Sequence, residues 1–215
     1  MTKKIILIIF LTLIQKFAFA ELIYVSNEKD HNMSVIDGDS LEVIKTVKVG
    51  HRPRGIILSK DKKKIIICTS DDNRIAVVDV ASLEVEYYLP SGPDPELIVM
   101  DAAGKFIYVA NEDDNMVTVV DYIGKKIVKE IPVGVEPEGM GLSPDGKTLV
   151  NTSETTNMAH FIDTSTLEIK ANVLVDARPR VAQYTSDGKF VWVSSEIGGT
   201  ISIIDPVKFE IIKKI

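Results

Sequence analysis

The sequence predicts an all-β fold assembled from a repeated unit of four short strands. An aspartate that closes one strand of each unit recurs with a spacing of 42 residues, at Asp37, Asp79, Asp121, Asp163 and Asp205. Within each period, short β-branched stretches alternate with turn-forming residues, and no helical apolar period is seen after residue 20. Units of about 40 to 45 residues with four strands are typical of propeller blades. We therefore expect a β-propeller with about 4.6 repeats of 42 residues.

The first twenty residues have the pattern of an export signal. Lys3 and Lys4 precede an apolar run over 5–14, and the Ala-Phe-Ala triplet at 18–20 is typical of a signal-peptidase site before Glu21. We expect residues 1–20 to be a cleaved signal peptide, which would place the protein in the periplasm or otherwise outside the cytoplasm. An uncleaved N-terminal anchor is the alternative. No later apolar stretch is long enough for a membrane span.

The remaining chain, 21–215, is predicted to be one propeller domain. Its repeats divide near 21–50, 51–92, 93–134, 135–176 and 177–215. The first repeat begins at its second strand, and no segment near Ile215 supplies the missing first strand. In closed propellers the C-terminal end provides that strand, so we expect a ring that is incomplete at its C-terminal end.

The composition excludes several classes of protein. The 215 residues are 45% hydrophobic and 26% charged, which is typical of a soluble globular chain. A single cysteine, Cys68, rules out an internal disulfide scaffold and a Cys-rich metal site, and its apolar surroundings predict a buried, inert thiol. The net charge of −6 argues against nucleic-acid binding, which requires a basic surface.

Two repeats carry a recognisable family motif. Residues 23–27 (Ile-Tyr-Val-Ser-Asn) and 107–111 (Ile-Tyr-Val-Ala-Asn) are each followed by a Val-Ile-Asp or Val-Val-Asp strand and then by a Val-Gly-x-x-Pro segment. These motifs resemble YVTN-type β-propeller repeats over the whole of 21–215, although Thr69, Ser153 and Ser195 replace the asparagine in the other repeats. The resemblance implies a ring of seven blades.

A narrower resemblance rests on fewer residues. Ser26-Asn27-Glu28, the Gly-x-Arg-Pro-Arg-Gly segment at 50–55 and the signal peptide are similar to exported propellers associated with catabolism dependent on pyrroloquinoline quinone (PQQ). We expect a non-enzymatic binding or accessory protein without a cofactor, and the resemblance implies that it serves PQQ-dependent alcohol oxidation or a linked transport system. It would engage a small polar ligand or a periplasmic protein partner. Two alternatives are a lactonase-like propeller hydrolase and a surface adhesion or assembly module.

The loops that enter the innermost strands carry the most distinctive charges. The two positions that enter these strands are basic in two repeats and acidic in two: Arg52 and Arg54, Asp94 and Glu96, Glu136 and Glu138, Arg178 and Arg180. One interpretation is that these charges form solvated salt bridges between blades. The other is a ligand site at the channel mouth, in which paired arginines hold an anion and His51 is the nearest titratable group. The ligand-site candidates are therefore Arg52, Arg54, Arg178, Arg180, His51, Glu96 and Glu138.

Other residue types give weaker signals. Glu112, Asp113 and Asp114 could provide oxygen ligands for Ca²⁺, although their spacing matches no EF-hand loop. His31 aligns with asparagines at a turn, His160 is expected to be partly exposed on a strand, and Trp192 is expected to pack between blades. No nucleophile and base are paired in the sequence, so no catalytic residue is predicted.

Overall fold

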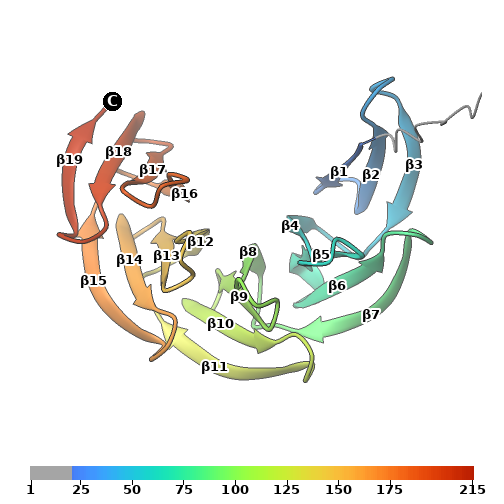
Figure 1. The fold of residues 1–215 in the computed structure, drawn as a ribbon, viewed down its shortest axis with the longest axis horizontal. Helices are drawn as coiled ribbons and strands as arrows, with labels where there is room; N and C mark the ends of the chain where they lie inside the picture. The colour runs from blue at the N-terminus through green and yellow to red at the C-terminus, as the bar shows by residue number, and fades with distance from the viewer. Residues whose placement is uncertain (1–20) are drawn as a thin grey trace, which may run out of the picture.

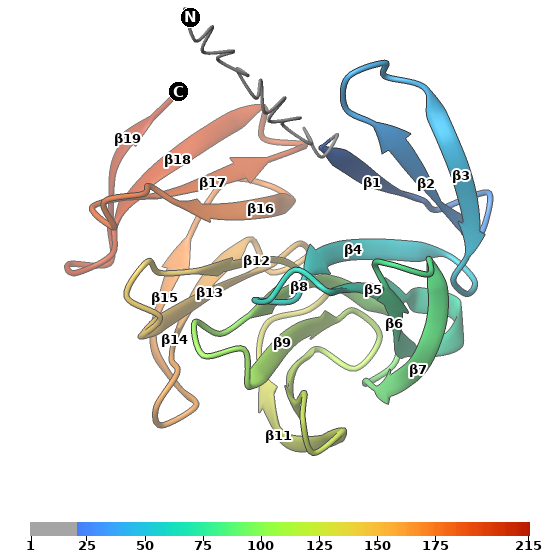
Figure 2. The ribbon, with the colours of Figure 1, turned by 45° about the vertical axis from the view of Figure 1, so that its right-hand side comes forward.

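A computed structural model describes residues 21–215 as five antiparallel sheets arranged in an open arc (Figures 1 and 2). The first sheet has three strands and the other four sheets have four each. The prediction of an all-β fold of four-stranded propeller blades is confirmed. The predicted signal peptide, 1–20, lies outside the described residues. Within the described part, no helix is long and apolar enough to cross a membrane.

The strands follow the order of the chain within every sheet, from the concave side of the arc to its outside. The first sheet contains β1 (Leu22–Asn27), β2 (Asn32–Asp37) and β3 (Val43–Lys48). The second contains β4 (Pro53–Leu58), β5 (Lys64–Thr69), β6 (Arg74–Asp79) and β7 (Glu84–Pro90), with a 3-10 turn at Ser70–Asp72. The third contains β8 (Pro95–Met100), β9 (Phe106–Asn111), β10 (Met116–Asp121) and β11 (Lys126–Pro132). The fourth contains β12 (Pro137–Leu142), β13 (Thr148–Ser153), β14 (Met158–Asp163) and β15 (Glu168–Leu174). The fifth contains β16 (Pro179–Tyr184), β17 (Val191–Ser195), β18 (Thr200–Asp205) and β19 (Glu210–Lys214).

The recurring aspartate has a local structural role. In each sheet its Oδ1 atom accepts hydrogen bonds from backbone N–H groups two and three residues further on; Asp79, for example, accepts from Ala81 and Ser82 at 3.0 and 2.9 Å. The same pair of bonds recurs at Asp37, Asp121, Asp163 and Asp205. The carboxylate of Asp is short enough to accept hydrogen bonds from the N–H groups of the turn, which have no partner in a neighbouring strand. This explains why Asp recurs before the turn that leads to the last strand of each sheet.

The core consists of four apolar clusters, one between each pair of neighbouring sheets. Between the second and third sheets, Ile66 and Val77 from one sheet meet Ile107 and Val109 from the next, and all four are completely buried. Because successive side chains of a strand point to opposite faces, each middle strand contributes to two clusters. Burial of both faces explains why these strands are continuously apolar instead of alternating.

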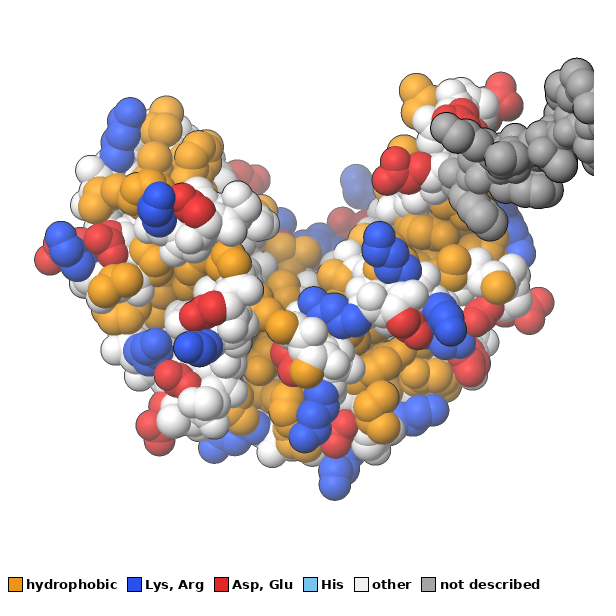
Figure 3. All heavy atoms as spheres, viewed as in Figure 1, with side chains coloured by type: hydrophobic (Ala, Val, Ile, Leu, Met, Phe, Trp, Pro, Cys, Tyr) orange, Lys and Arg blue, Asp and Glu red, His pale blue; other side chains and the backbone are white. Residues whose placement is uncertain are grey.

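The inner strands β4, β8, β12 and β16 line the concave side and run in the same direction. We call the end where they begin, at residues 53, 95, 137 and 179, the upper mouth, and the end where they finish the lower mouth. The space-filling view shows the opening between the first and last sheets and hydrophobic side chains that reach the surface among the charged ones (Figure 3).

A charged candidate site at the upper mouth

A hydrogen bond from a backbone N–H to a side chain recurs from sheet to sheet and fixes the entry loops of the upper mouth. Asn73, Asn115 and Asn157 adopt left-handed backbone conformations, and each side-chain oxygen accepts a hydrogen bond from a backbone N–H of the next sheet's entry loop, at 3.0 to 3.1 Å. His31 occupies the same position, also with a positive φ, and its Nδ1 accepts from the Arg52 N–H at 3.0 Å. Asparagine tolerates this conformation better than most residues. His31 is therefore engaged as a turn residue, as the repeat alignment predicts.

A second set of backbone bonds brings another group of side chains to the mouth. The N–H groups of Glu112, Glu154 and Glu196 donate to the carbonyls of Asp94, Glu136 and Arg178 at 2.8 to 3.0 Å. These bonds tie the loop after the second strand of each sheet to that sheet's entry loop. Side chains from two loops of one sheet therefore reach the same space.

Four arginines and six carboxyl groups form a continuous set of ion pairs across all five sheets, which we call the mouth network. Arg52 contacts Asp94 at 2.7 Å and Glu96 at 2.9 Å. Arg54 also contacts Glu96, and it reaches Glu138, two sheets away, at 3.0 Å. Counting contacts of 3.3 Å or less, the network consists of Glu28, Arg52, Arg54, Asp94, Glu96, Glu138, Glu154, Arg178, Arg180 and Glu196. Asp71 lies at its edge, 3.9 Å from Arg52.

The other half of the mouth network repeats this arrangement. Arg180 contacts Glu138 at 3.2 Å and also pairs with Glu154, while Arg178 contacts Glu154 at 2.7 Å and Glu196 at 3.3 Å. The side chains of Glu138 and Glu154 are 6% and 4% exposed. These are therefore ion pairs between sheets, but their central carboxylates are buried and not solvated. The arginine forks bind carboxylates of the chain itself.

Carboxyl groups outnumber arginines at this mouth, and burial together with neighbouring charges shifts the pKa values of several of them. Glu96 is completely buried, and burial together with the charge of Glu138 raises its pKa to about 9 despite Arg54 and Arg52. Burial also raises the pKa of Glu138, against the effects of Arg180 and Arg54. Glu112 has a raised pKa because of burial and because of Asp94 and further carboxylates nearby. Burial alone would raise the pKa of Glu28, but Arg52 and Arg54 lower it.

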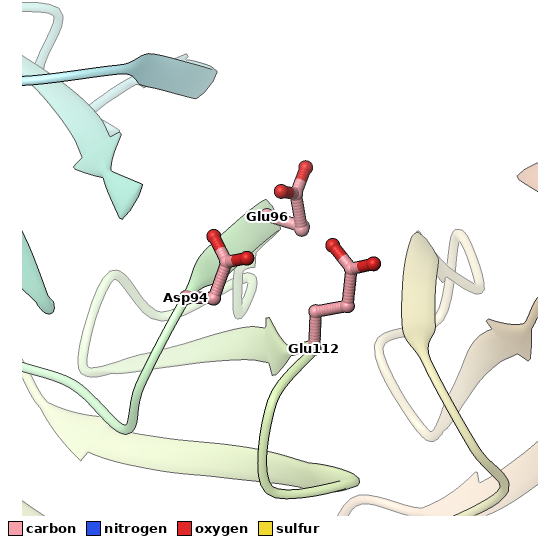
Figure 4. A group of neighbouring side chains, drawn as sticks. All are labelled: Asp94, Glu96 and Glu112. Atoms are coloured by element: carbon pink, nitrogen blue, oxygen red, sulfur yellow. The ribbon is translucent and has the colours of Figure 1, made fainter. Parts of the chain in front are cut away.

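The carboxyl groups of Asp94, Glu96 and Glu112 lie close to one another (Figure 4). Oxygen atoms of Asp94, Glu96 and Glu112 lie within 4.8 Å of one another, and the three carboxyl groups point toward a common space. Asp94 immediately precedes β8, Glu96 lies at the start of β8, and Glu112 comes from the loop after β9. Of the sequence-predicted metal candidates, Glu112 joins this group, whereas Asp113 and Asp114 do not.

His51 and His160 lie apart from the mouth network. The Nδ1 atom of His51 is 2.8 Å from Asp72, with the His51 side chain 67% exposed. His160 is 5% exposed instead of partly exposed as predicted, because its ring, on β14, lies against the neighbouring strands and the Gly134 loop. Its Nδ1 is 2.6 Å from Asn172 Oδ1, and its Nε2 accepts from the Gly134 N–H at 3.0 Å and lies 3.1 Å from Ser153 Oγ. Its pKa is lowered by burial, against the effect of Asn172. Neither histidine forms an ion pair with the mouth network.

Comparison with known proteins identifies the family. A family profile described as the cytochrome D1 heme domain matches residues 61–182, which is more than half of the chain. The chain belongs to the cytochrome D1 heme domain family. Heme carries one-electron and O₂ chemistry in enzymes. Membership of the D1 heme domain family therefore contradicts the sequence-based prediction that the chain is not an enzyme.

A solved structure supports the β-propeller fold of this member of the cytochrome D1 heme domain family. Kuenenia stuttgartiensis hydrazine synthase matches with a TM-score of 0.79 and 24% sequence identity, over 86% of this chain and 59% of that one. The chain thus spans less than two thirds of the length of that structure. At this identity the likeness concerns the fold. No curated protein matches the sequence.

The described residues do not fit a heme, although the family name implies one. Heme iron is held by His, Cys, Tyr or a Met/His pair. Within 21–215, the three histidines lie outside the inner strands, Cys68 is buried between sheets, and Tyr184 packs in a core cluster. The methionines of the inner strands, Met100 and Met140, line a cavity at the lower mouth, and no histidine of residues 21–215 belongs to that lining. At the upper mouth, the arginine and carboxylate side chains of the mouth network are paired with one another. We therefore derive no chemical step through heme.

Proposed function

We propose that this chain is an exported propeller domain of a redox system, linked to PQQ-dependent alcohol catabolism, and that its upper mouth binds a small, positively charged ligand. The single observation that carries the ligand class is the excess of carboxylates over arginines at the upper mouth. Six carboxyl groups pair with only four arginines, and Glu112 stands beside them without an ion-pair partner among residues 21–215.

The charge balance favours a cation over the anion considered from sequence alone. Each arginine fork is occupied by internal carboxylates, so an added anion would have to displace one of them. Burial is the main cause of the raised pKa values of Glu96 and Glu112, and neighbouring carboxylates add to it; an added cation would relieve this second, repulsive part. Carboxylate oxygens are the ligands that hard divalent cations such as Ca²⁺ prefer.

The link to a redox system rests on resemblance. The D1 family is named for a heme domain, and the Ser-Asn-Glu and Gly-x-Arg-Pro-Arg-Gly segments resemble exported propellers associated with PQQ-dependent catabolism. Export rests on the signal pattern of residues 1–20. N-terminal sequencing of the protein isolated from the periplasm should find Glu21 first; a chain that keeps Met1 would contradict the export part of the proposal.

Thermal unfolding of the purified protein with added CaCl₂, MgCl₂ or a diamine tests the ligand class. A ligand at one hundred times its Kd stabilises the folded state by about 2.7 kcal/mol. We expect stabilisation by at least one of these cations, lost in Glu112→Gln and kept in Asp113→Asn, the adjacent carboxylate outside the three-carboxylate group. Stabilisation by sodium oxalate instead of the cations, or equal loss in both variants, would contradict the proposal.

A further inference from the structure

The same inner strands that carry charge at the upper mouth border an open cavity with a mixed apolar and polar lining at the lower mouth. This cavity has a volume of about 400 Å³ and is lined by the ends of β4, β8, β12 and β16 and by the turns that follow them. Its volume falls within the usual range of small-molecule sites, about 300 to 1,000 Å³. The mouth network lies at the opposite ends of these strands. The two sites are therefore formed by the same strands but by different side chains.

The lining of the cavity is chemically asymmetric. Ile57, Leu58, Val99 and Met140 provide apolar walls from three different sheets. Leu58 is 41% exposed, so part of this apolar surface faces the cavity and the solvent instead of the core. Met140 has a flexible, polarisable side chain that adapts to varied ligand shapes. Apolar walls of this kind favour the body of a ring compound or a short hydrocarbon chain.

Three polar side chains of the described residues belong to this lining: Lys60, Ser143 and Gln183. Lys60 lies on the turn after β4, and no carboxylate of the described chain lies within ion-pair distance of its ammonium group. Gln183 uses its amide nitrogen to donate to the Tyr184 carbonyl at 3.2 Å, which leaves its amide oxygen for other partners. No aspartate or glutamate of residues 21–215 belongs to the lining. The cavity therefore offers one uncompensated positive charge at the edge of an apolar wall.

We propose that the lower mouth binds a small amphiphilic anion, with its apolar body against Ile57, Val99 and Met140 and its anionic group at Lys60. The inference concerns a site separate from the upper mouth and does not depend on the function proposed there. Charge separates the two sites: the upper mouth carries surplus carboxylates, whereas the lining of the lower cavity contains one ammonium group, that of Lys60, and no carboxylate of residues 21–215. A ligand with both an apolar body and a negative charge matches only the lower one.

Two fluorescent dyes test this inference because they share an apolar body and differ in charge. Anilinonaphthalene sulfonate carries one negative charge, and phenylnaphthylamine is neutral. We expect Lys60→Glu to weaken binding of the anionic dye by about tenfold or more while leaving the neutral dye within about twofold. Lys62→Glu, on the same turn but outside the lining, is the matched control and should leave both dyes unchanged.

A second variant tests the position of the dye. Leu58→Glu places a carboxylate in the cavity at a partly exposed position, where the fold tolerates it, and should weaken both dyes, the anionic one more. Glu112→Gln, at the upper mouth, should change neither. If Lys60→Glu and Leu58→Glu both bind the dyes like the parent protein, the dyes bind elsewhere and the inference is wrong. If Lys60→Glu weakens the two dyes equally, or Lys62→Glu matches it, the anionic ligand class is overturned.

Discussion

The middle of the arc and its two ends carry the same sequence repeat but differ in burial. Ile65, Ile107, Leu149 and Val191 are completely buried, whereas Ile23, at the same repeat position in the first sheet, is 42% exposed. At the next position, Tyr108 is 2% exposed in the third sheet, and Trp192 is 43% exposed in the fifth. The prediction that Trp192 packs between blades was therefore wrong for the described chain.

The reason is geometric. In each sheet the side chains at Ile23 and its equivalents face the preceding sheet, and those at Trp192 and its equivalents face the following one. The first sheet has no described sheet before it, and the fifth has none after it. A repeat position thus determines which way a side chain points, but its burial depends on a neighbour. The same substitution should therefore have unequal effects in the middle and at the ends.

The largest difference is expected for the aromatic position. Tyr108→Ala would leave a cavity in a closed interface and should lower the free energy of unfolding by about 3 to 5 kcal/mol. Trp192→Ala removes a side chain that is already partly hydrated and should cost less than about 1.5 kcal/mol. Urea unfolding followed by circular dichroism measures both. Equal losses would show that Trp192 is buried in solution, for example by association with another molecule.

The aliphatic position should show the same contrast at a smaller scale. We expect Ile65→Ala to lower the free energy of unfolding by about 2 to 5 kcal/mol and Ile23→Ala by less than about 1 kcal/mol. Ile65 lies on β5, between β4 and β6, whereas Ile23 lies on β1, the inner edge of its three-stranded sheet. The difference between the two variants therefore combines the contribution of the neighbouring sheet with that of the edge position. A ratio near one would contradict the interpretation.

Carboxyl groups of the middle and the end should give pH dependences of opposite sign. The pKa of Glu96 is raised from 4.5 to about 9 by burial and by Glu138; its stabilising contribution is therefore complete below pH 4.5 and is lost as the pH rises toward 9. The pKa of Asp205 is lowered by backbone N–H groups of Lys208 and Val207, so its contribution is present above about pH 4 and is lost on acidification.

The two variants Glu96→Gln and Asp205→Asn test these signs. Relative to the parent protein, Glu96→Gln should gain stability between about pH 5 and 9, whereas Asp205→Asn should be less stable at about pH 7 and approach the parent protein near pH 2. Thermal unfolding across this pH range measures both. A parent protein whose stability relative to Glu96→Gln rises with pH would contradict the raised pKa of Glu96.

The smallest effect is expected at the left-handed turn position. Asn115 accepts a hydrogen bond from the N–H of Glu136 in the following sheet, so Asn115→Ala should cost about 1 kcal/mol through the lost bond and the unfavourable backbone conformation. Gly199, at the equivalent position in the last sheet, faces open space, because no atom lies within 4 Å of the place that a Cβ would occupy. Gly199→Asn should therefore change stability by less than about 0.5 kcal/mol in a thermal unfolding assay.

Much of the upper mouth was accessible to sequence reasoning. The 42-residue alignment places Arg52, Asp94, Glu136 and Arg178 at one repeat position, and the structure places them at one end of the inner strands. The contacts were not accessible. That Arg54 reaches Glu138 across two sheets, and that Glu112 joins Asp94 and Glu96, depends on the curvature of the arc.

The lower cavity was missed entirely by sequence reasoning. Its lining comes from the ends of inner strands, where Ile57, Val99, Gly141 and Gln183 share one repeat position without sharing a chemical type. An apolar residue in a strand predicts burial equally well in a core or against a cavity. Only the packing of four strands around one space distinguishes the two.

By itself, the sequence determined the repeated unit, the strand order within each sheet and the direction in which each side chain points. These are local properties, set by β-branched residues, by turns with Asp, Asn and Gly, and by the two-residue alternation of a strand. The tertiary structure alone decided which repeat positions are buried, which arginines meet which carboxylates and where space remains between the inner strands. Those outcomes depend on neighbouring sheets, because burial and ion pairing are interactions between elements that lie far apart in the chain.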